Sequence, residues 1–256
     1  ESKEPMGKAQ EHRLEEYLKQ VLPQVKGVVL SDYGSGTITD KLLGQIFAYC
    51  HEHNIPIIVD SRYAILRFKT VDYIKQNDAE LSAAIGRDLA TEEELVQGGC
   101  ELLVKMSAKG ALITRGEDGM SLFQIISPQE AADYLKSQEA SGSGDFGQFR
   151  EGLTVKLVVK RQTGRLSVVQ ELISYQDRDI LVSHIPVTDK SEVYDVSGAG
   201  DTCVATVILG LAAGLEPLLA CQLSNEASGI AVRKMGTSVV YARELKTRFR
   251  QLGYEA

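Results

Sequence analysis

The chain has 256 residues, a formal net charge of −7, 43% hydrophobic residues and 25% charged residues, which are ordinary values for a globular protein. This length can bury a full core as one large domain or two small ones. The negative charge argues against a nucleic-acid partner, and no apolar run approaches the roughly 20 residues of a membrane span.

The four cysteines, Cys50, Cys100, Cys203 and Cys221, lie far apart and form no CxxC pair. We expect buried, reduced thiols and hence a cytoplasmic protein. No signal peptide is visible, and the chain starts at Glu1 rather than Met. We therefore expect a fragment, a processed product or a renumbered chain.

The first part of the chain predicts alternating helices and strands. Helical spacing covers 8–22 and resumes after Thr39, a suitable N-cap. The short apolar runs at 27–32 and 55–60 predict buried strands. A strand, a helix and a strand at this spacing form a βαβ unit, so we expect a doubly wound α/β domain with a mostly parallel sheet and helices on both faces.

Further elements follow the same alternation. Thr91 and Glu94 form a capping box for a helix reaching about residue 105, and strands are predicted at 110–114 and 120–126. Ligands in such sheets bind outside the carboxyl ends of the strands.

The region 127–190 differs in character. Ser127 begins a short helix, residues 137–152 are small and polar and predict a mobile loop, and 153–175 alternates around a Thr-Gly turn as a β-hairpin does. Beyond it, helices are predicted at 202–214, 217–234 and 243–252.

The segment "DVSGAGDT" (195–202) has the composition of an anion-binding turn. Gly198, Ala199 and Gly200 carry little side-chain bulk, so their backbone N–H groups can approach a ligand at the positive end of a helix. Asp201 would then lie beside the anion, where it could accept a proton from an incoming hydroxyl. An ordinary loop-to-helix junction capped by Asp201 is the alternative.

This segment resembles the C-terminal signature of the PfkB (ribokinase-like) family of carbohydrate kinases, with Ser197 where Thr is common. Three more segments resemble motifs of that family, in the family's order: "QNDAEL" (76–81), "ITRGEDG" (113–119) and "SNEASGIAVRKMGTS" (224–238). The resemblance implies a ribokinase-like fold and the ATP-dependent, Mg²⁺-requiring phosphorylation of a hydroxyl on a sugar or sugar phosphate.

The resemblance also implies a role for each matching residue. Asp201 would be the catalytic base, and the N–H groups of residues 198–200 would stabilise the transferring phosphoryl group. The other candidates are Asn77 and Glu80 for Mg²⁺, Thr114, Gly116 and Gly119 for the nucleotide phosphates, Asn225 and Gly229 for adenine, Asp195, Ser197, Gly236 and Ser238 for a monovalent cation such as K⁺, and Asp32 and Arg62 for the substrate. For Asp195, capping of its own turn is the alternative.

Within the family, "LSDYGSG" (30–36), "VDSR" (59–62) and "VRKMGTS" (232–238) most resemble the kinase of ADP-heptose synthesis. This resemblance implies D-glycero-D-manno-heptose 7-phosphate, phosphorylated at O1, as the substrate. Ser35 stands where that subgroup commonly has Lys, and the Ser-Arg of "VDSR" replaces a usual Pro-Lys. The arginine is left to bind a phosphate.

Two departures from the family bear on the domain organisation. Family chains usually have an upstream portion with the first strands, a Gly-rich sugar motif and a lid sheet, and nothing here matches it. We therefore interpret 1–256 as a ribokinase-like kinase domain lacking that N-terminal portion, with 127–190 as an insertion. A nucleotide-binding regulatory or inactive homologue without a complete sugar pocket is the alternative. Lid strands often form dimers in this family, which leaves a homodimer open.

Two weaker motifs compete with this interpretation. "GSGDFG" (142–147) satisfies GxGxxG, but no predicted strand leads into it, so we expect a flexible loop. A nicotinamide-dependent oxidoreductase would need a Gly-rich turn after the first strand, and "SDYGSG" (31–36) is a poor version of that turn.

Overall fold

The computed structural model describes residues 6–142, 144–150, 152–163, 166–188 and 193–253. Its α-helices are α1 (Lys8–Val21), α2 (Asp40–Glu52), α3 (Asp78–Ile85), α4 (Glu92–Met106), α5 (Pro128–Ser141), α6 (Ala199–Ala212), α7 (Pro217–Ala231) and α8 (Ala242–Gln251). Its strands are β1 (Val28–Asp32), β2 (Ile57–Ser61), β3 (Tyr73–Asn77), β4 (Gly110–Thr114), β5 (Met120–Ile126), β6 (Asp145–Arg150), β7 (Leu153–Thr163), β8 (Leu166–Tyr175) and β9 (Arg178–Ile185).

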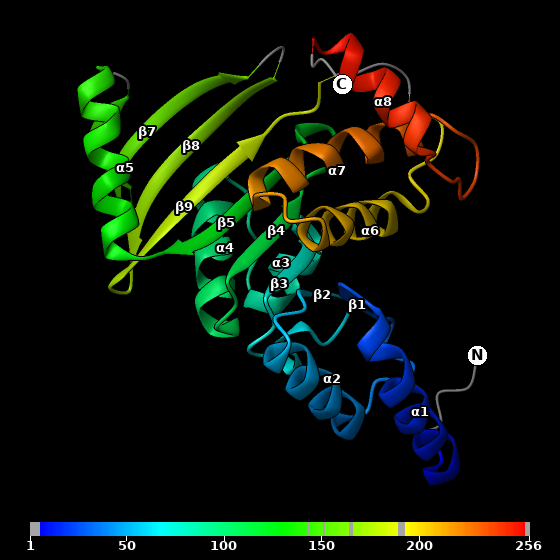
Figure 1. Ribbon diagram of the computed structural model, residues 1–256. Coiled ribbons are helices and arrows are strands. Elements are labelled where there is room, and N and C mark those ends of the chain that lie inside the picture. The colour runs from blue at the N-terminus through cyan, green and yellow to red at the C-terminus, as the bar shows by residue number, and fades with distance from the viewer. Residues whose placement is uncertain (1–5, 143, 151, 164–165, 189–192, 254–256) are drawn as a thin grey trace.

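The described strands form one nine-stranded sheet in the order β1-β2-β3-β4-β5-β9-β8-β7-β6 (Figure 1). Strands β1 to β4 pair in parallel, so their carboxyl ends lie along one edge, as the βαβ pattern predicts. From β4 onward each neighbouring pair is antiparallel. The parallel half therefore provides the edge at which a ligand site is expected.

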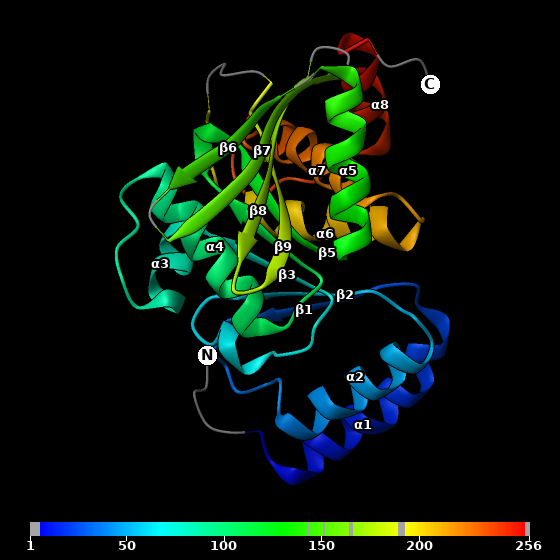
Figure 2. The ribbon, with the colours of Figure 1, turned by 90° about the vertical axis from the view of Figure 1, so that its left-hand side faces the viewer.

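Helices cover both faces of the sheet, which confirms the layered α/β architecture. Figure 2 shows α3 and α4 on one side of the strands and α5, α6 and α7 on the other. The larger core cluster joins Ile46 of α2, Leu81 of α3 and Leu103 of α4 to the sheet. A second cluster packs Val204 and Val207 of α6 against the opposite face. Burial of these apolar side chains is the main force that holds the layers together.

Local signals explain where several helices begin. The Thr39 hydroxyl accepts a hydrogen bond from the backbone N–H of Leu42, which caps α2. The capping box of Thr91 and Glu94 is present at the start of α4. Another capping box begins α5 at Ser127, but that helix continues to Ser141 and is longer than the short helix predicted.

The segment 137–152 differs from the mobile loop that was predicted. Residues 137–141 belong to α5 and residues 145–150 form β6, so the loop expected over 137–152 is wrong for these two stretches, and the loop expected at 142–147 is wrong from residue 145 onward; residues 143 and 151 lie outside the described residues. Backbone pairing with β7 gives this polar segment its hydrogen bonds, a tertiary effect that composition does not show. The hairpin predicted at 153–175 is confirmed by the pairing of β7 with β8, and its turn at 164–165 lies outside the described residues.

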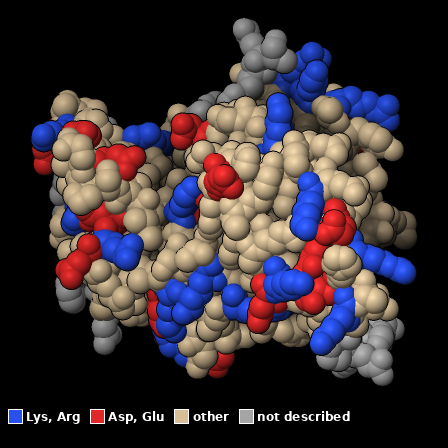
Figure 3. Space-filling model, turned by 60° about the horizontal axis from the view of Figure 1, so that its bottom comes forward, with Lys and Arg blue, Asp and Glu red and all other residues tan. Residues whose placement is uncertain are grey.

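The distribution of surface charges and the burial of the cysteines are those expected from the composition. Lysine, arginine and acidic side chains are interspersed over the face drawn in Figure 3. All four cysteines are buried, free thiols. Among the helices of the described residues, none combines the length and the apolar character that crossing a bilayer requires.

Candidate active site

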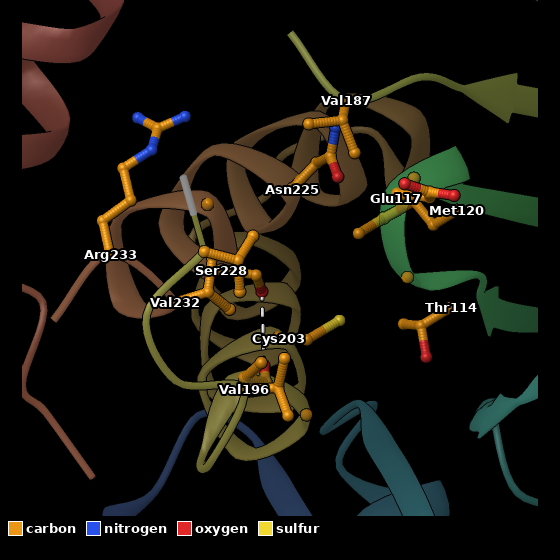
Figure 4. Close-up of a pocket in the computed structure, with 16 residues that line it drawn as sticks. Thr114, Glu117, Met120, Val187, Val196, Cys203, Asn225, Ser228, Val232 and Arg233 are labelled. Carbon is orange, nitrogen blue, oxygen red and sulfur yellow. Dashed lines mark hydrogen bonds between the residues drawn. The ribbon is translucent and has the colours of Figure 1, made fainter. Parts of the chain in front are cut away.

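One cavity, of about 430 Å³, lies between the β4–β5 turn, α6 and α7; we call it the apolar cavity. The five predicted nucleotide residues all line it: Thr114, Gly116, Gly119, Asn225 and Gly229. In Figure 4, Thr114, Glu117 and Met120 face Ser228, Val196 and Val232 across the opening. The cavity has mostly apolar walls with a few polar groups, which is typical of sites for a flat organic ligand.

The glycines of the β4–β5 turn have structural reasons to be glycine. Gly116 and Gly119 have φ angles of 56° and 86°, in the region that favours glycine. An added Cβ on Gly119 would lie 2.1 Å from the carbonyl oxygen of Ile185, so that only glycine lets the turn pack against the end of β9. The turn is thereby held at the mouth of the apolar cavity.

Asn225 joins α7 to the segment that follows β9. Its Nδ2 donates to the carbonyl oxygen of Pro186 at 2.8 Å. The side chain therefore holds two walls of the apolar cavity together, while Gly229 one turn later leaves the wall without a side chain.

A second cavity, of about 490 Å³, opens at the carboxyl ends of β1, β2 and β3; we call it the polar cavity. Its lining contains Asp32, Tyr33, Asp60, Arg62, Tyr63, Lys75, Asn77, Glu80, Gly200 and Asp201. The predicted base, the predicted Mg²⁺ residues and the predicted substrate residues are thus brought together in one place.

Gly200, at the start of α6, lines both cavities. The helix begins at Ala199, and Gly198 is its N-cap with φ of 77°. The Ala199 N–H donates to the Val196 carbonyl, so it is not available to a ligand. Within the described part of the chain, the N–H groups of Gly200 and Asp201 have no acceptor. Of the predicted donors 198–200, only that of Ala199 is therefore taken by an acceptor among the described residues, and the N–H groups of Gly200 and Asp201 are free in the first turn of the helix.

Asp201 projects into the polar cavity and accepts a hydrogen bond from Tyr33. The phenolic oxygen lies 3.2 Å from Oδ1 of Asp201, and the charge of Asp201 raises the pKa of Tyr33 above its ordinary value. The sequence analysis did not single out Tyr33 for this role. Its place directly after Asp32, at the end of a strand, was the available signal.

Asn77 and Glu80 form the capping box of α3. The Glu80 N–H donates to Asn77 Oδ1 at 2.7 Å, and the Asn77 N–H donates to Glu80 Oε2 at 2.9 Å. The box turns both side chains toward the polar cavity and leaves one carboxylate oxygen of Glu80 outside it. The spacing of this motif therefore has a structural role as well as a chemical one.

Asp32 organises the rim of the polar cavity. It is buried, and its carboxylate accepts hydrogen bonds from the Gly34 N–H at 3.0 Å and from the Ser61 hydroxyl at 2.9 Å. Arg62, by contrast, is exposed at the rim and lies over the ring of Tyr63 at 5.6 Å. Of the two predicted substrate residues, Arg62 is the one that carries hydrogen-bond donors on an exposed side chain.

Asp195 ties together the two segments predicted to hold a monovalent cation. Its carboxylate accepts from the Ser197 N–H at 2.8 Å and from the Gly236 N–H at 3.0 Å, and these hydrogen bonds, Ser197 first, lower its pKa. The Ser238 hydroxyl instead donates to the Ala231 carbonyl at 3.3 Å. The structure thus brings Asp195, Ser197 and Gly236 together, and the alternative role of Asp195 as a turn cap is also present.

Two charged residues that line the polar cavity, the partly buried Asp60 and the buried Lys75, were not predicted as site residues. Asp60 on β2 and Lys75 on β3 are register partners, and Lys75 Nζ lies 3.1 Å from Asp60 Oδ2. Burial raises the pKa of Asp60, and the charge of Lys75 limits the rise. Burial works to lower the pKa of Lys75, but the charge and hydrogen bond of Asp60 together with nearby Glu80 act against it, and the net direction is upward.

Comparison with known proteins identifies the family of this chain. The family model of pfkB carbohydrate kinases matches residues 3–145 and 173–242. Bifunctional protein HldE of Geobacter sulfurreducens is 31% identical over 96% of this chain, and that of Geobacter metallireducens is 30% identical over 96%. The chain spans only 39% of the length of either relative.

Solved structures show the same fold. Phosphofructokinase-2 from Escherichia coli in complex with potassium has a TM-score of 0.60 at 16% identity, covering 98% of this chain and 64% of that one. Arabidopsis thaliana ribokinase complexed with ribose and ATP has a TM-score of 0.57 at 16% identity, covering 98% and 61%. The match of the family model to most of the chain decides its membership: this chain belongs to the pfkB family of carbohydrate kinases.

Proposed function

We propose that this chain transfers the terminal phosphoryl group of ATP to a hydroxyl group of a sugar or sugar phosphate. The observation that carries the proposal is the meeting of the two cavities at Gly200. An ATP molecule in the apolar cavity would direct its phosphates toward the start of α6. A sugar in the polar cavity would place its hydroxyl beside Asp201.

The proposed chemistry uses the charges and donors at this junction. Asp201 accepts the proton of the sugar hydroxyl as its oxygen forms a bond to phosphorus and the bond to the ADP oxygen breaks. The N–H groups of Gly200 and Asp201 stabilise the charge on the transferring phosphoryl group. Thr114, Gly116 and Gly119 border the phosphates, and Asn225 and Gly229 border the adenine.

The residues of the polar cavity fit Mg²⁺. This ion takes one or two carboxylates and keeps water and phosphate oxygens as its other ligands, so a large protein cage is not needed. Asn77 and the free oxygen of Glu80 would hold it, through water. When bound, Mg²⁺ neutralises charge on the phosphates.

The proposed acceptor is a phosphorylated sugar, with D-glycero-D-manno-heptose 7-phosphate at O1 as the specific candidate. The similarity to the HldE proteins supports this choice. Arg62 supports the choice of a phosphorylated acceptor. Within the described residues no carboxylate lies within ion-pair distance of its guanidinium. The guanidinium is therefore available to bind an anion at the rim of the polar cavity.

The proposal also includes a monovalent cation, a homodimer and a cytoplasmic location. A monovalent cation near Asp195, Ser197 and Gly236 is supported by the similar phosphofructokinase-2 in complex with potassium. A homodimer is supported only by analogy, because that phosphofructokinase-2 has also been solved as a tetramer. Free, buried thiols support a cytoplasmic location.

The proposed domain organisation is a single kinase domain over 1–256 with an insertion at 127–190. The gap in the family match at 146–172, which falls on β6, β7 and most of β8, supports the insertion.

The test is ADP release from MgATP against a panel of sugars and sugar phosphates, for this chain and for Asp201→Asn. Turnover on one acceptor that falls by about 1,000-fold in Asp201→Asn, with nucleotide affinity retained, supports the proposal. Asp88→Asn, an exposed aspartate outside both cavities, is the matched control and should retain full activity. Nucleotide binding without turnover on any acceptor would favour the regulatory or inactive homologue.

A further inference from the structure

Lys75 is a buried cation that the proposed mechanism does not use. Its side chain is only 6% exposed, although lysine is among the residues least often buried. It lies on β3 between Ile74 and Gln76, on the face that α6 covers, where its charge has to be held by specific partners.

The partners of Lys75 account for part of its donor capacity. An ammonium group has three N–H donors, and in the described residues Asp60 is the one hydrogen-bond acceptor of Nζ, at 3.1 Å. Lysine is ordinarily charged at neutral pH, and Nζ of Lys75 is paired with the carboxylate of Asp60. Two donors of a charged group therefore remain for something else at the wall of the polar cavity.

The direction of Nζ identifies where those donors act. A Cβ added to Gly200 would lie 3.0 Å from Nζ, so the ammonium group lies directly against the start of α6. The free N–H groups of Gly200 and Asp201 begin at the same place. A charged side chain and a helix N-terminus thus converge where the two cavities meet.

Because several carboxylates line the polar cavity, an anion can bind there only with a cation beside it. Asp60, Glu80 and Asp201 all line it, and each would repel a phosphoryl group that approached from the apolar cavity. Arg62 is at the exposed rim, whereas Lys75 is at the buried end beside Gly200. Lys75 is therefore placed for the reacting phosphoryl group, and Arg62 for a phosphate carried by the acceptor.

We propose that Lys75 binds the terminal phosphoryl group of the nucleotide during transfer, and that Asp60 is a positioning residue that holds its ammonium group beside Gly200. This inference rests on the proposed kinase function. It assigns a contact to the phosphoryl group in addition to the backbone N–H groups, and it explains why a chain would keep a buried lysine in a strand.

The test compares the affinities for MgATP and MgADP by calorimetry, because only ATP carries the terminal phosphoryl group. Lys75→Met alone would leave the partly buried carboxylate of Asp60 without its partner, so the main variant is the double change Asp60→Asn with Lys75→Met. Lys109→Met is the control, since Lys109 is an exposed lysine that pairs with Asp72 at 2.7 Å outside both cavities.

We expect the double variant to lose about 10-fold more affinity for ATP than for ADP. With an acceptor identified, we expect kcat to fall by about 100-fold with little change in the acceptor KM. Equal losses for ATP and ADP, or a raised acceptor KM with unchanged kcat, would overturn the role of Lys75 alone. A parent chain that binds neither nucleotide would overturn the proposed function together with this inference, whereas one that binds ATP without turning over any acceptor still tests Lys75 through the two affinities.

Discussion

Tyr33 and Asp201 are 168 positions apart in the sequence, and the fold places the phenolic hydroxyl of one 3.2 Å from the carboxylate of the other. Tyr33 directly follows β1, and Asp201 lies in the first turn of α6. The contact closes the polar cavity between the sheet edge and the helix that carries the proposed base. It also gives that base a neighbour whose own titration reports on it.

The first prediction concerns this titration. The negative charge of Asp201 is the largest cause that raises the pKa of Tyr33, so Asp201→Asn should bring that pKa back toward 10. Phenolate absorbance during alkaline titration measures the change, with Tyr33→Phe subtracted to isolate one ring among ten tyrosines. An unchanged titration of Tyr33 in Asp201→Asn would contradict the contact.

The second prediction concerns the turn at the mouth of the apolar cavity. Gly119→Ala should lower the free energy of unfolding by about 3 kcal/mol, because a Cβ would collide with the Ile185 carbonyl and the backbone is in a glycine region. Gly116→Ala has a positive φ but open space around it, so a cost of about 1 kcal/mol is expected. Urea unfolding measures both, and equal costs would show that the collision is relieved.

The third prediction concerns acid stability. Hydrogen bonds from Ser197 and Gly236 lower the pKa of Asp195 below 3.8, so this carboxylate stabilises the fold above that pH and loses its contribution as the pH falls toward its native pKa. Asp195→Asn should therefore lower stability at neutral pH and reduce the pH dependence of the unfolding free energy in the acid range. Parallel pH profiles of the two proteins would argue against it.

The fourth prediction concerns the attachment of α8. Arg248 donates to Glu226 at 2.7 Å and to the Thr188 hydroxyl at 2.8 Å, and Glu226 is only 3% exposed. Arg248→Met should cost about 3–5 kcal/mol because it leaves a buried carboxylate without its partner. Adding Glu226→Gln should recover part of that loss in thermal or urea unfolding. A double variant no more stable than Arg248→Met would locate the cost elsewhere.

Much of the fold could be predicted because its elements follow simple periodic patterns. The strands at 27–32, 55–60 and 110–114 are continuous apolar runs, and each is confirmed within a few residues. The strand β3 was not predicted, because Lys75 and Gln76 interrupt the apolar pattern although both are buried. Their burial depends on Asp60 and on the Ser61 carbonyl, which come from the neighbouring strand.

The candidate site, too, could be predicted only in part. The motif residues could be grouped in advance because parallel strands end at one edge, and the structure gathers Asn77, Glu80 and Asp201 there. Their roles stay predictions. The contacts of Tyr33 and Lys75 could not be predicted, since each depends on where α6 lies against the sheet rather than on local spacing.

The absence of a side chain at Gly200 has a consequence for inhibition. Because this residue borders both cavities, a single molecule that carries an adenosine group at one end and a sugar at the other meets no side chain of Gly200 at the crossing. Linking two weak ligands in this way makes the second binding event intramolecular and raises affinity by about 100-fold or more when the linker fits. The junction that serves transfer thus also favours bisubstrate inhibitors over compounds confined to the adenine side.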